Sequence, residues 1–372
     1  MTRARIPFVS LAPREDLPGI RAAIDRVVAS GWFVLGPEVE AFETAFAAAC
    51  HASHAVGVGT GTDAIALILR ALGIGRGDEV ITTPLSAAYT ALAVLTTGAR
   101  PVFADVESDR LTLDADAAAS AVTPRTRAIL PVHLYGQAAD MAAIERVASR
   151  YHLAIVEDCC QAHLATAAGR PVGTIGVAGA FSFYPTKNLG ALGDGGAVVT
   201  NDRGLAERIS RLRNGGQSDR YHHVDAGINS RLDEMQAAVL CARLPLLAAW
   251  TARRRTLAAA YRAALAEAPV MLPAVADEGH VYHLFVVRTP RRGGPGDRAG
   301  LQRHLTARGV ETLVHYPVPI PRQPAMAGTD PTECPRAAAA CDEVLSLPLY
   351  PGLSDGALSE VAAAVCEFPA KD

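Results

Sequence analysis

The sequence contains very little lysine. Only two of its 35 basic side chains are lysines, Lys187 and Lys371, and arginine supplies the rest of the positive charge. Lysine carries an amine whose pKa can be lowered, so it can act as a nucleophile and form a Schiff base, which arginine does not do. Lys371 is the penultimate residue of the chain. Lys187 is therefore either a position that requires an amine or a lysine retained by chance.

Long apolar runs and an excess of positive charge are also missing. No uninterrupted run approaches the roughly 18 apolar residues of a membrane helix, and residues 1–7 do not lead into the apolar segment of a signal peptide. The formal charge of −3 gives no positive field for a nucleic-acid backbone or an anionic membrane. We therefore expect a cytoplasmic protein that binds neither nucleic acid nor membrane.

The cysteines lack the spacing of a zinc site or a disulfide framework. There are seven, an odd number, and no two are spaced as C-x-x-C. The adjacent Cys159 and Cys160 with His163 make a poor tetrahedral ligand set, so we expect reduced thiols and no metal. Half of the 372 residues are hydrophobic and 20% are charged, which is typical of a globular protein. This length allows about two to three domains, or one large α/β domain with a smaller appendage.

Short apolar runs alternate with helix-like stretches along the first two-thirds of the chain. This pattern is typical of a mainly parallel sheet covered by helices, and about seven strands are expected in it. Helices are predicted over 63–72 and 138–150. The predicted strands include residues 54–58, 79–82, 101–104, 128–132, 154–156 and 197–200.

The pattern changes near residue 232, where an alanine- and arginine-rich helical segment begins and continues to about residue 267. Its Arg253–Arg255 triplet is interpreted as a solvated helix face, with a binding patch as the alternative. Strands are predicted over 283–289 and 312–316, with a Gly/Pro/Arg loop over 291–298 between them. The sequence therefore predicts a large α/β domain over 1–245, with an N-terminal arm, and a smaller α+β domain over 246–372.

Three motifs follow predicted strands, at the edge where parallel sheets bind ligands. Gly57–Asp63 joins a strand to a helix, and its small residues let backbone amides approach a phosphate; the same turn could serve packing only. Glu157–Asp158 ends another strand, and one of these acids could pair with a protonated ring nitrogen or cap a helix. In Phe181–Asn188, Ser182 can donate to a phosphate while Lys187 returns to the same site.

A Schiff-base lysine, a carboxylate for a pyridine nitrogen and a phosphate-binding turn are the parts that pyridoxal phosphate needs. The chain strongly resembles the sugar aminotransferases of the DegT/DnrJ/EryC1/StrS family, almost from end to end. The matching blocks are 35–43, Gly61–Ala64, Pro131–Gln137, Glu157–Asp158 with Gln161–His163, Phe181–Gly196, Asn229–Ala238, His315–Pro317 and Leu345–Pro348. The resemblance implies the type I (aspartate aminotransferase-like) fold of the pyridoxal-phosphate-dependent transferases.

The resemblance also implies roles for individual residues. Lys187 would hold the cofactor covalently and move the proton, Asp158 would pair with the pyridine nitrogen, and Gln161 would contact the phenolic oxygen of the ring. Asn229 would reach the site of a second subunit, so a homodimer is implied. The expected cofactor-binding residues are Thr60, Gly61, Thr62, Tyr89, Asp158, Gln161, Ser182, Lys187 and Asn229. The expected contacts with a nucleotide-linked sugar are Tyr184, Arg231, His315 and Tyr316.

Some positions depart from the family pattern. Ala87 and Ala88 occupy the places where the family usually has an aromatic residue against the cofactor, and Tyr89 could stack from a shifted position. Cys159, Cys160 and Leu164 replace the usual residues around the acid, which changes the packing near the ring. Pro321 stands where the family often has a histidine, which affects substrate recognition.

The implied reaction is transfer of an amino group, from L-glutamate, to a keto group of a dTDP- or UDP-linked sugar. The Phe183–Gly190 block resembles members that act on 3-keto sugars, while 4-keto sugars and cyclitol ketones are alternatives. A sugar dehydratase of this fold would have histidine in place of Lys187. A regulatory protein on the same fold would have no use for the lysine, and a dinucleotide-binding oxidoreductase rests only on a glycine turn in which Thr62 replaces the third glycine.

Overall fold

The fold is known from a computed structural model that describes residues 6–12, 14–289, 296–329 and 333–369. Lys371 and most of the predicted 291–298 loop lie outside the described residues.

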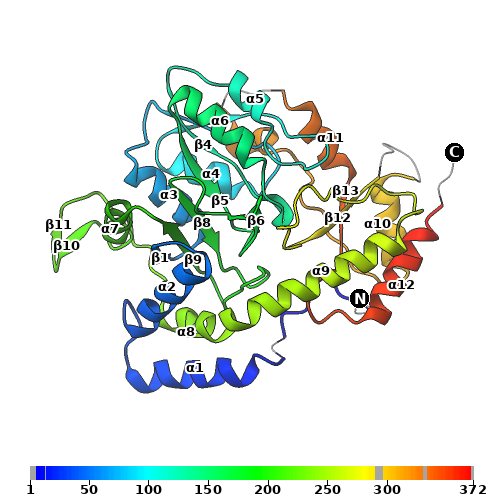
Figure 1. Cartoon of the computed structure of the whole chain (residues 1–372), viewed down its shortest axis with the longest axis horizontal. Helices are drawn as coiled ribbons and strands as arrows, with labels where there is room; N and C mark the ends of the chain where they lie inside the picture. The colour runs from blue at the N-terminus through cyan, green and yellow to red at the C-terminus, as the bar shows by residue number, and fades with distance from the viewer. Residues whose placement is uncertain (1–5, 13, 290–295, 330–332, 370–372) are drawn as a thin grey trace.

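The large part of the molecule is built on a seven-stranded sheet (Figure 1). Strand β9 runs antiparallel to both of its neighbours, whereas the other adjacent pairs are parallel. This confirms the predicted α/β class and its mostly parallel sheet. The strands lie in the order β1 (His54–Val58), β9 (Gly196–Thr200), β8 (Ala178–Ser182), β5 (Ala154–Asp158), β4 (Thr126–Leu130), β2 (Glu79–Thr82) and β3 (Arg100–Phe103).

Both faces of the sheet are covered, as the nearly continuous apolar strands require. In β9, Val198 packs into the core cluster that holds α3, while its neighbours Ala197 and Val199 point into the opposite cluster with α2 and α8. Helix α3 is largely buried against α4, α7 and the β8–β9 part of the sheet, and its less buried residues are Thr62, Asp63 and Arg70. The covering helices are α2 (Pro37–Ala49), α3 (Gly61–Ala71), α4 (Tyr89–Thr96), α5 (Ala115–Ser120), α6 (Met141–Tyr151) and α7 (Arg203–Leu212).

A long helical segment connects the sheet to the C-terminal part (Figure 1). It consists of α8 (Glu234–Arg243), the 3₁₀ turn η2 (Leu244–Leu246) and α9 (Leu247–Ala264), and it confirms the helix predicted from about 232 to 267. By length and composition alone the stretch Glu234–Ala264 could cross a membrane. Its apolar residues are instead used in packing, since Leu240, Leu247 and Leu257 are fully buried in core clusters.

The prediction for the arginine triplet on α9 was wrong at its central residue. Arg255 is exposed and Arg253 is half-buried, but only 5% of Arg254 is accessible. A helix turns by about 100° per residue, so three consecutive side chains cannot share one solvated face.

The C-terminal part has a small antiparallel pair, β12 (Phe285–Arg288) and β13 (Val344–Leu347), with α10 (Arg298–Ala307), α11 (Pro335–Glu343) and α12 (Asp355–Cys366). The predicted strand over 283–289 is confirmed as β12. The one over 312–316 was wrong, because this segment makes only a single bridge, from Leu313 to Ser346. It then leaves β13 as Tyr316 reaches across to Gln161. We propose the division into residues 1–245 and 246–372, with the boundary inside η2.

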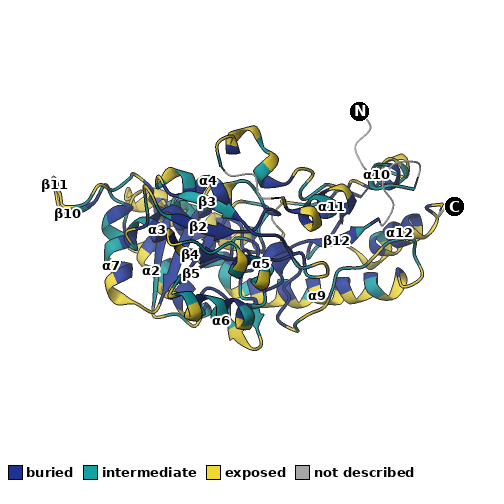
Figure 2. Cartoon of the chain, turned by 90° about the horizontal axis from the view of Figure 1, so that it is seen from above, coloured by how far each residue is buried: buried dark blue, intermediate teal, exposed yellow. Residues whose placement is uncertain are grey.

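The described N-terminal residues pack with the C-terminal part. Ile6 forms a parallel bridge with Val310 and lies in the same core cluster as β12 and β13. The chain then crosses to the large part, where α1 (Leu17–Ser30) packs along α8. Figure 2 shows α10 and α12 of the C-terminal part at the opposite end of the molecule from α7. The arm and the α8–α9 segment therefore both connect the two parts.

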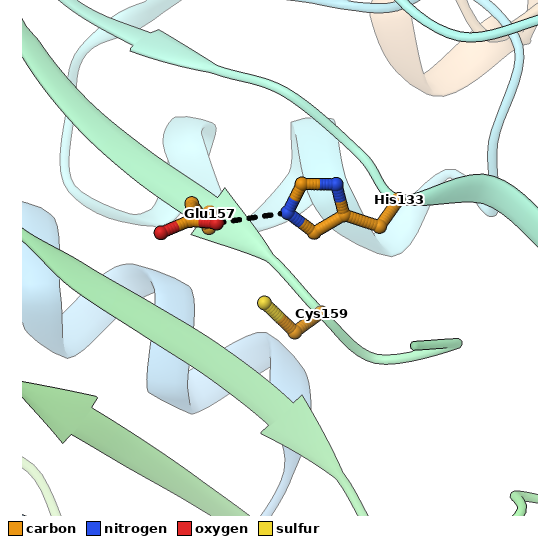
Figure 3. Close-up of side chains that lie close together, drawn as sticks. All are labelled: His133, Glu157 and Cys159. Carbon is orange, nitrogen blue, oxygen red and sulfur yellow. Dashed lines mark hydrogen bonds and ion pairs between the residues drawn. The ribbon is translucent and has the colours of Figure 1, made fainter. Parts of the chain in front are cut away.

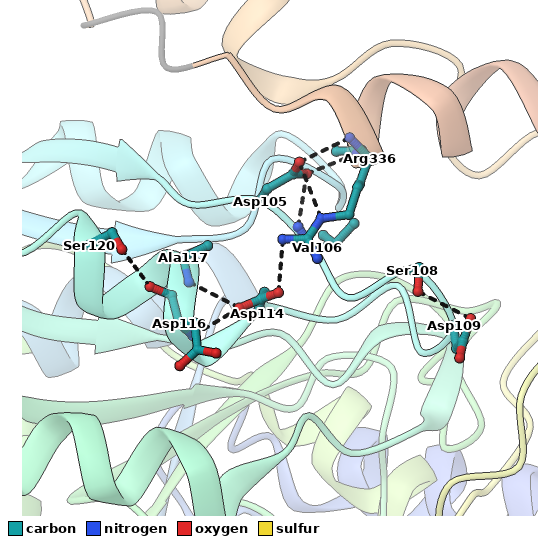
Figure 4. A network of polar contacts seen from close by, with 10 residues as sticks. Asp105, Val106, Ser108, Asp109, Asp114, Asp116, Ala117, Ser120 and Arg336 are labelled. Carbon is teal, nitrogen blue, oxygen red and sulfur yellow. Dashed lines mark hydrogen bonds and ion pairs between the residues drawn. The ribbon is translucent and has the colours of Figure 1, made fainter.

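A carboxylate of the large part holds the start of α11 (Figure 4). Asp105 accepts hydrogen bonds from the backbone N–H groups of Arg336 (2.9 Å) and Ala337 (2.9 Å), which no residue within the helix can satisfy. The Arg336 guanidinium in turn forms an ion pair with Asp114 at 2.8 Å. This network ties α11 to the loop after β3.

Glu79 carries an acid-sensitive contribution to stability. The side chain is 1% exposed and bonds to Thr123, Arg100 and Arg125. Burial raises its pKa, but the three hydrogen bonds outweigh burial and lower the pKa from 4.5 to about 2. Because the pKa of Glu79 is lower in the folded than in the unfolded chain, its carboxylate stabilises the fold at pH values above the unfolded pKa. This stabilisation is lost as the pH falls towards 2.

We therefore expect the free energy of unfolding to fall by about 3 kcal/mol between pH 5 and pH 2 through Glu79 alone. Urea unfolding of the wild type and of Glu79→Gln over this pH range measures it. The variant should be less stable at pH 6 and should lose less stability on acidification; equal pH slopes for the two proteins would contradict this origin.

Candidate active site

Several strands end at one edge of the sheet, and the candidate residues follow these ends. Val58 of β1 and Ser182 of β8 both lie opposite Gly196, the first residue of β9. Asp158, the last residue of β5, lies opposite Ala180 of β8. The three motifs found in the sequence therefore lie close together in space. They do so because β1, β9, β8 and β5 are neighbours in the sheet.

The turn after β1 forms a cradle at the start of α3. Thr60 caps the helix by accepting a hydrogen bond from the Asp63 N–H at 3.0 Å. A Cβ added to Gly61 would lie 2.6 Å from Cys160 Sγ and 2.8 Å from Ser182 Cβ, so only glycine lets the backbone approach here. The helix start, with Thr62 in its first turn, and the Ser182 hydroxyl suit a phosphate group.

Ser230 fixes the shape of this cradle. Its hydroxyl accepts a hydrogen bond from the Gly59 N–H at 2.9 Å and donates to the Asp63 carboxylate at 2.8 Å. The contact spans 171 residues of sequence. Sequence reasoning singled out Asn229 and Arg231 on either side but missed Ser230, because a lone serine has no distinguishing pattern.

Asp158 is the acid that faces the site. It is 4% exposed, and its carboxylate accepts hydrogen bonds from the Thr90 hydroxyl (2.8 Å) and the Cys160 N–H (3.1 Å). These two donors orient the carboxylate and leave further lone pairs for a protonated ring nitrogen. Thr90 was not predicted, and its contact comes from α4, 68 residues away in the sequence.

Glu157 points the opposite way, as alternate strand residues must. It accepts from the N–H groups of Gly173, Ile175 and Gly176 and bonds to the His133 ring at 3.0 Å. Figure 3 shows this pair beside Cys159, a grouping of metal-ligand residue types. His133 Nδ1 accepts from the Ala139 N–H, so Nε2 carries the proton that it donates to Glu157. Burial keeps the pKa of the Cys159 thiol well above its usual value. This donor set is committed to structural hydrogen bonds and does not suit a metal ion.

Lys187 lies in the turn that joins β8 to β9. Its N–H donates to the Tyr184 carbonyl at 2.8 Å, and its side chain is half-buried. Burial lowers the pKa of the amine, and Cys160 and Asp158 act in the opposite direction. Burial and then the charge of Lys187 lower the pKa values of His163, His283 and His315. A lowered pKa brings the amine closer to the neutral form that a nucleophile needs.

Gln161 joins the sheet edge to the segment at 315–316. Its carbonyl accepts from the Tyr135 N–H at 2.8 Å, and its amide donates to the Tyr316 hydroxyl at 2.9 Å. The Tyr135 hydroxyl donates to the His315 carbonyl. One amide hydrogen of Gln161 is left for a further acceptor, as a contact with a phenolic oxygen requires. Tyr135 is a further residue that the sequence did not single out as a contact.

The other candidates are not brought into this cluster within one chain. Asn229 is exposed, and its backbone bridges to Asn214. Arg231 donates to the Asn214 side chain at 2.7 Å. Tyr184 and Tyr89 are 52% and 66% exposed. Tyr89 is the first residue of α4, one residue before Thr90. Because a helix turns by about 100° per residue, the Tyr89 side chain points in a different direction from the Thr90 side chain, which bonds to Asp158.

The residues at the sheet edge fit pyridoxal phosphate: a glycine cradle for the phosphate, a buried carboxylate for the ring nitrogen and an amine of lowered pKa. The model of the DegT/DnrJ/EryC1/StrS aminotransferase family matches residues 17–366. The chain belongs to this family. It is therefore a pyridoxal-phosphate-dependent aminotransferase, which confirms the predicted enzyme class, cofactor and type I fold.

Family members with high similarity are known from sequence and structure. The dTDP-3-amino-3,4,6-trideoxy-alpha-D-glucose transaminase of Streptomyces venezuelae is 51% identical over 370 residues, covering 98% of this chain and 96% of the relative. The erythromycin biosynthesis sensory transduction protein EryC1 of Saccharopolyspora erythraea is 50% identical over 366 residues, covering 96% of this chain and 98% of the relative. The crystal structure of S. venezuelae DesV in complex with a ketimine intermediate superposes with a TM-score of 0.94, at 50% identity and 99% coverage of both chains.

Proposed function

We propose that this aminotransferase moves an amino group from L-glutamate to the C3 keto group of a nucleotide-linked deoxy sugar. The observation that carries the proposal is the meeting of Lys187, Asp158 and the Gly61 cradle at one sheet edge. The choice of a 3-keto sugar rests on the similarity to the 3-amino sugar transaminase of S. venezuelae. A 4-keto sugar and a cyclitol ketone are the alternative acceptors.

The residues act in distinct ways in this proposal. Bound pyridoxal phosphate supplies an aldehyde for the amine and a ring that accepts electrons. Gly61, Thr62 and Ser182 bind its phosphate, Thr60 shapes the turn, and Gln161 binds the phenolic oxygen. Asp158 keeps the ring nitrogen protonated, and Lys187 anchors the cofactor and carries the proton to and from the substrate carbon. His315, Tyr316 and Tyr184 would contact the sugar nucleotide, and Tyr89 would have to turn its exposed side chain to contact the cofactor ring.

A homodimer completes the site in this proposal. Asn229 is exposed in the single chain although it adjoins Ser230, which holds the phosphate cradle. The nearby residues Trp32, Phe33 and Val34 are large, apolar and 46–56% exposed, and Val34 bridges to Asp233. An apolar exposed segment beside this loop supports coverage by a second copy, whose site Asn229 and Arg231 would enter. We place this enzyme in the cytoplasm.

The first half of the reaction is tested by absorption spectroscopy. We expect the purified holoenzyme to lose the visible absorption of its bound cofactor when L-glutamate is added, because the amine is transferred to the cofactor. A dTDP-linked 3-keto sugar should restore the original band, and the matching 4-keto sugar should restore it more slowly. A spectrum that ignores L-glutamate would overturn the donor assignment, and faster recovery with the 4-keto sugar would overturn the assignment of the acceptor carbon.

A further inference from the structure

A short strap of the C-terminal part lies against the large part next to the Lys187 turn. The strap, residues 280–284, precedes β12, and its Val281 N–H donates to the Gly136 carbonyl at 2.9 Å. Gly136 has a φ of +94°, and a Cβ added to it would lie 2.8 Å from the backbone nitrogen of His283. Only glycine therefore lets the strap and the large part approach this closely.

Asn188, the residue after Lys187, is bonded to the strap through both ends of its amide. Its Nδ2 donates to the Val281 carbonyl at 3.1 Å, and its Oδ1 lies 3.2 Å from His283 Nδ1. A backbone carbonyl can only accept, so Val281 fixes the orientation of the amide and turns Oδ1 towards the histidine. His283 Nδ1 therefore carries a proton and donates it to Asn188. Both side chains are buried, with 4% of Asn188 and 7% of His283 exposed.

His283 is neutral in this arrangement. Burial, and then the charge of Lys187, keep its pKa well below the usual value. A neutral imidazole has one N–H, and the Asn188 carbonyl accepts it. Loss of this bond would leave a buried donor and a buried acceptor without each other, which is unfavourable. The pair is therefore maintained at neutral pH.

The strap is itself fixed from two sides. Arg254 of α9 is 5% exposed, and its Nη1 donates to the carbonyls of Tyr282 and His283, both at 3.3 Å. Val281 is fully buried in a core cluster that also contains apolar residues of the Lys187 turn. The strap thus gives His283 a fixed place from which to bond to Asn188.

Lys187 has a long, flexible side chain, so its backbone must be well placed for the amine to meet the reacting atoms. Its own N–H donates to the Tyr184 carbonyl at 2.8 Å, and the strap holds the residue that follows it. We propose that His283 is a positioning residue for Lys187 and acts through its hydrogen bond to Asn188. This inference rests on the proposed function, in which Lys187 anchors the cofactor and moves the proton, and it adds what holds that lysine in place.

The test uses variants that break or restore this one bond. His283→Phe keeps a planar ring and removes the donor, whereas His283→Asn offers an amide N–H close to the place of Nδ1. Asn188→Ala breaks the same bond from the other side, and it carries the test if His283→Phe does not fold. His304→Phe is the matched control, because His304 bonds to the Ala364 carbonyl at 2.8 Å within the C-terminal part. Thermal unfolding shows whether each variant folds.

Three measurements are made on each protein. Visible absorption follows the rate at which pyridoxal phosphate, added to the full-length apoprotein, forms its covalent link to Lys187. A single turnover of the holoenzyme gives the rate of the first half-reaction with L-glutamate. Calorimetry gives the affinity for pyridoxamine phosphate, which has the same ring and phosphate but carries an amine where the link would form, so it binds without a bond to Lys187.

We expect His283→Phe and Asn188→Ala to slow both link formation and the first half-reaction by about tenfold to a hundredfold, because both need the Lys187 amine in place. The affinity for pyridoxamine phosphate should change less than about threefold, since no contact with it is removed. His283→Asn should recover most of both rates, and His304→Phe should match the wild type. The double variant should be no slower than Asn188→Ala, because both changes break the same bond.

Other results would overturn the assignment. Wild-type rates in His283→Phe or Asn188→Ala would show that the bond does not position the lysine. An equal loss of rate and of pyridoxamine phosphate affinity would show that His283 supports the whole site instead of Lys187. Additive losses in the double variant would show that the two residues act separately. These failures differ from failure of the proposed function, in which the wild-type cofactor spectrum would not respond to L-glutamate at all.

Discussion

Replacement of Lys187 by arginine is expected to stop transamination. Arginine keeps the positive charge, but its guanidinium neither forms the covalent link to the cofactor nor exchanges a proton at neutral pH. Loss of the proton transfer alone costs about 10²–10⁴-fold in rate. Single-turnover absorption changes after addition of L-glutamate measure the effect directly, because they report the first half-reaction apart from product release.

The composition of the chain offers a matched control. Lys371 is the other lysine, and Lys371→Arg should react at the wild-type rate. The Lys187→Ala variant leaves room for a small amine, so added methylamine should restore part of its rate but none of that of Lys187→Arg. A Lys187→Arg enzyme within tenfold of the wild type would show that another group moves the proton.

Replacement of Asp158 by asparagine is expected to lower kcat by about 10²–10³-fold. The substitution is nearly isosteric, so the packing around this buried position should survive. It removes the negative charge that keeps the ring nitrogen protonated, and that charge acts in a site with little water, where it is strongest. Steady-state kinetics with saturating L-glutamate and keto sugar measure kcat.

Thr90→Val separates the charge of Asp158 from its orientation. This variant removes the 2.8 Å hydrogen bond to the carboxylate and keeps the charge. We expect a loss of about tenfold or less, in line with one hydrogen bond of about 1 kcal/mol. If Thr90→Val were as damaging as Asp158→Asn, position rather than charge would be the contribution of the acid.

Local patterns predicted the sheet and the ends of its strands well. Apolar runs placed β1, β2 and β5, and the motifs that follow β1, β5 and β8 were found because each is continuous in sequence. Since strand ends of a parallel sheet share one edge, Asp158 and Lys187 could be assigned to one site from the sequence alone. Glu157 and Asp158 are adjacent on β5, so their side chains point to opposite faces of the sheet and only one of them can enter the site. The structure shows that this residue is Asp158.

Contacts between distant segments were beyond such patterns. Ser230, Thr90 and Tyr135 support the site through hydrogen bonds from other elements, and nothing in their local sequence distinguishes them from other polar residues. Arg254 was assigned to solvent because neighbouring arginines usually are exposed, whereas α9 turns it into the core. The segment 312–316 has strand-like composition, but Leu313 makes its only ladder bridge, to Ser346, and Tyr316 contacts Gln161 in the large part of the molecule.

The pairing of Ile6 with Val310 sets an order of events during synthesis on the ribosome. The sheet strands span residues 54–200, so they are complete long before residue 310 has been made. The arm has to wait, because its partners, Val310 and the Glu311 carboxylate that accepts from the Phe8 N–H, are among the later residues to emerge. The C-terminal core, with Ile6 as one of its members, therefore closes last, and contacts of such long sequence separation are the slow ones to form.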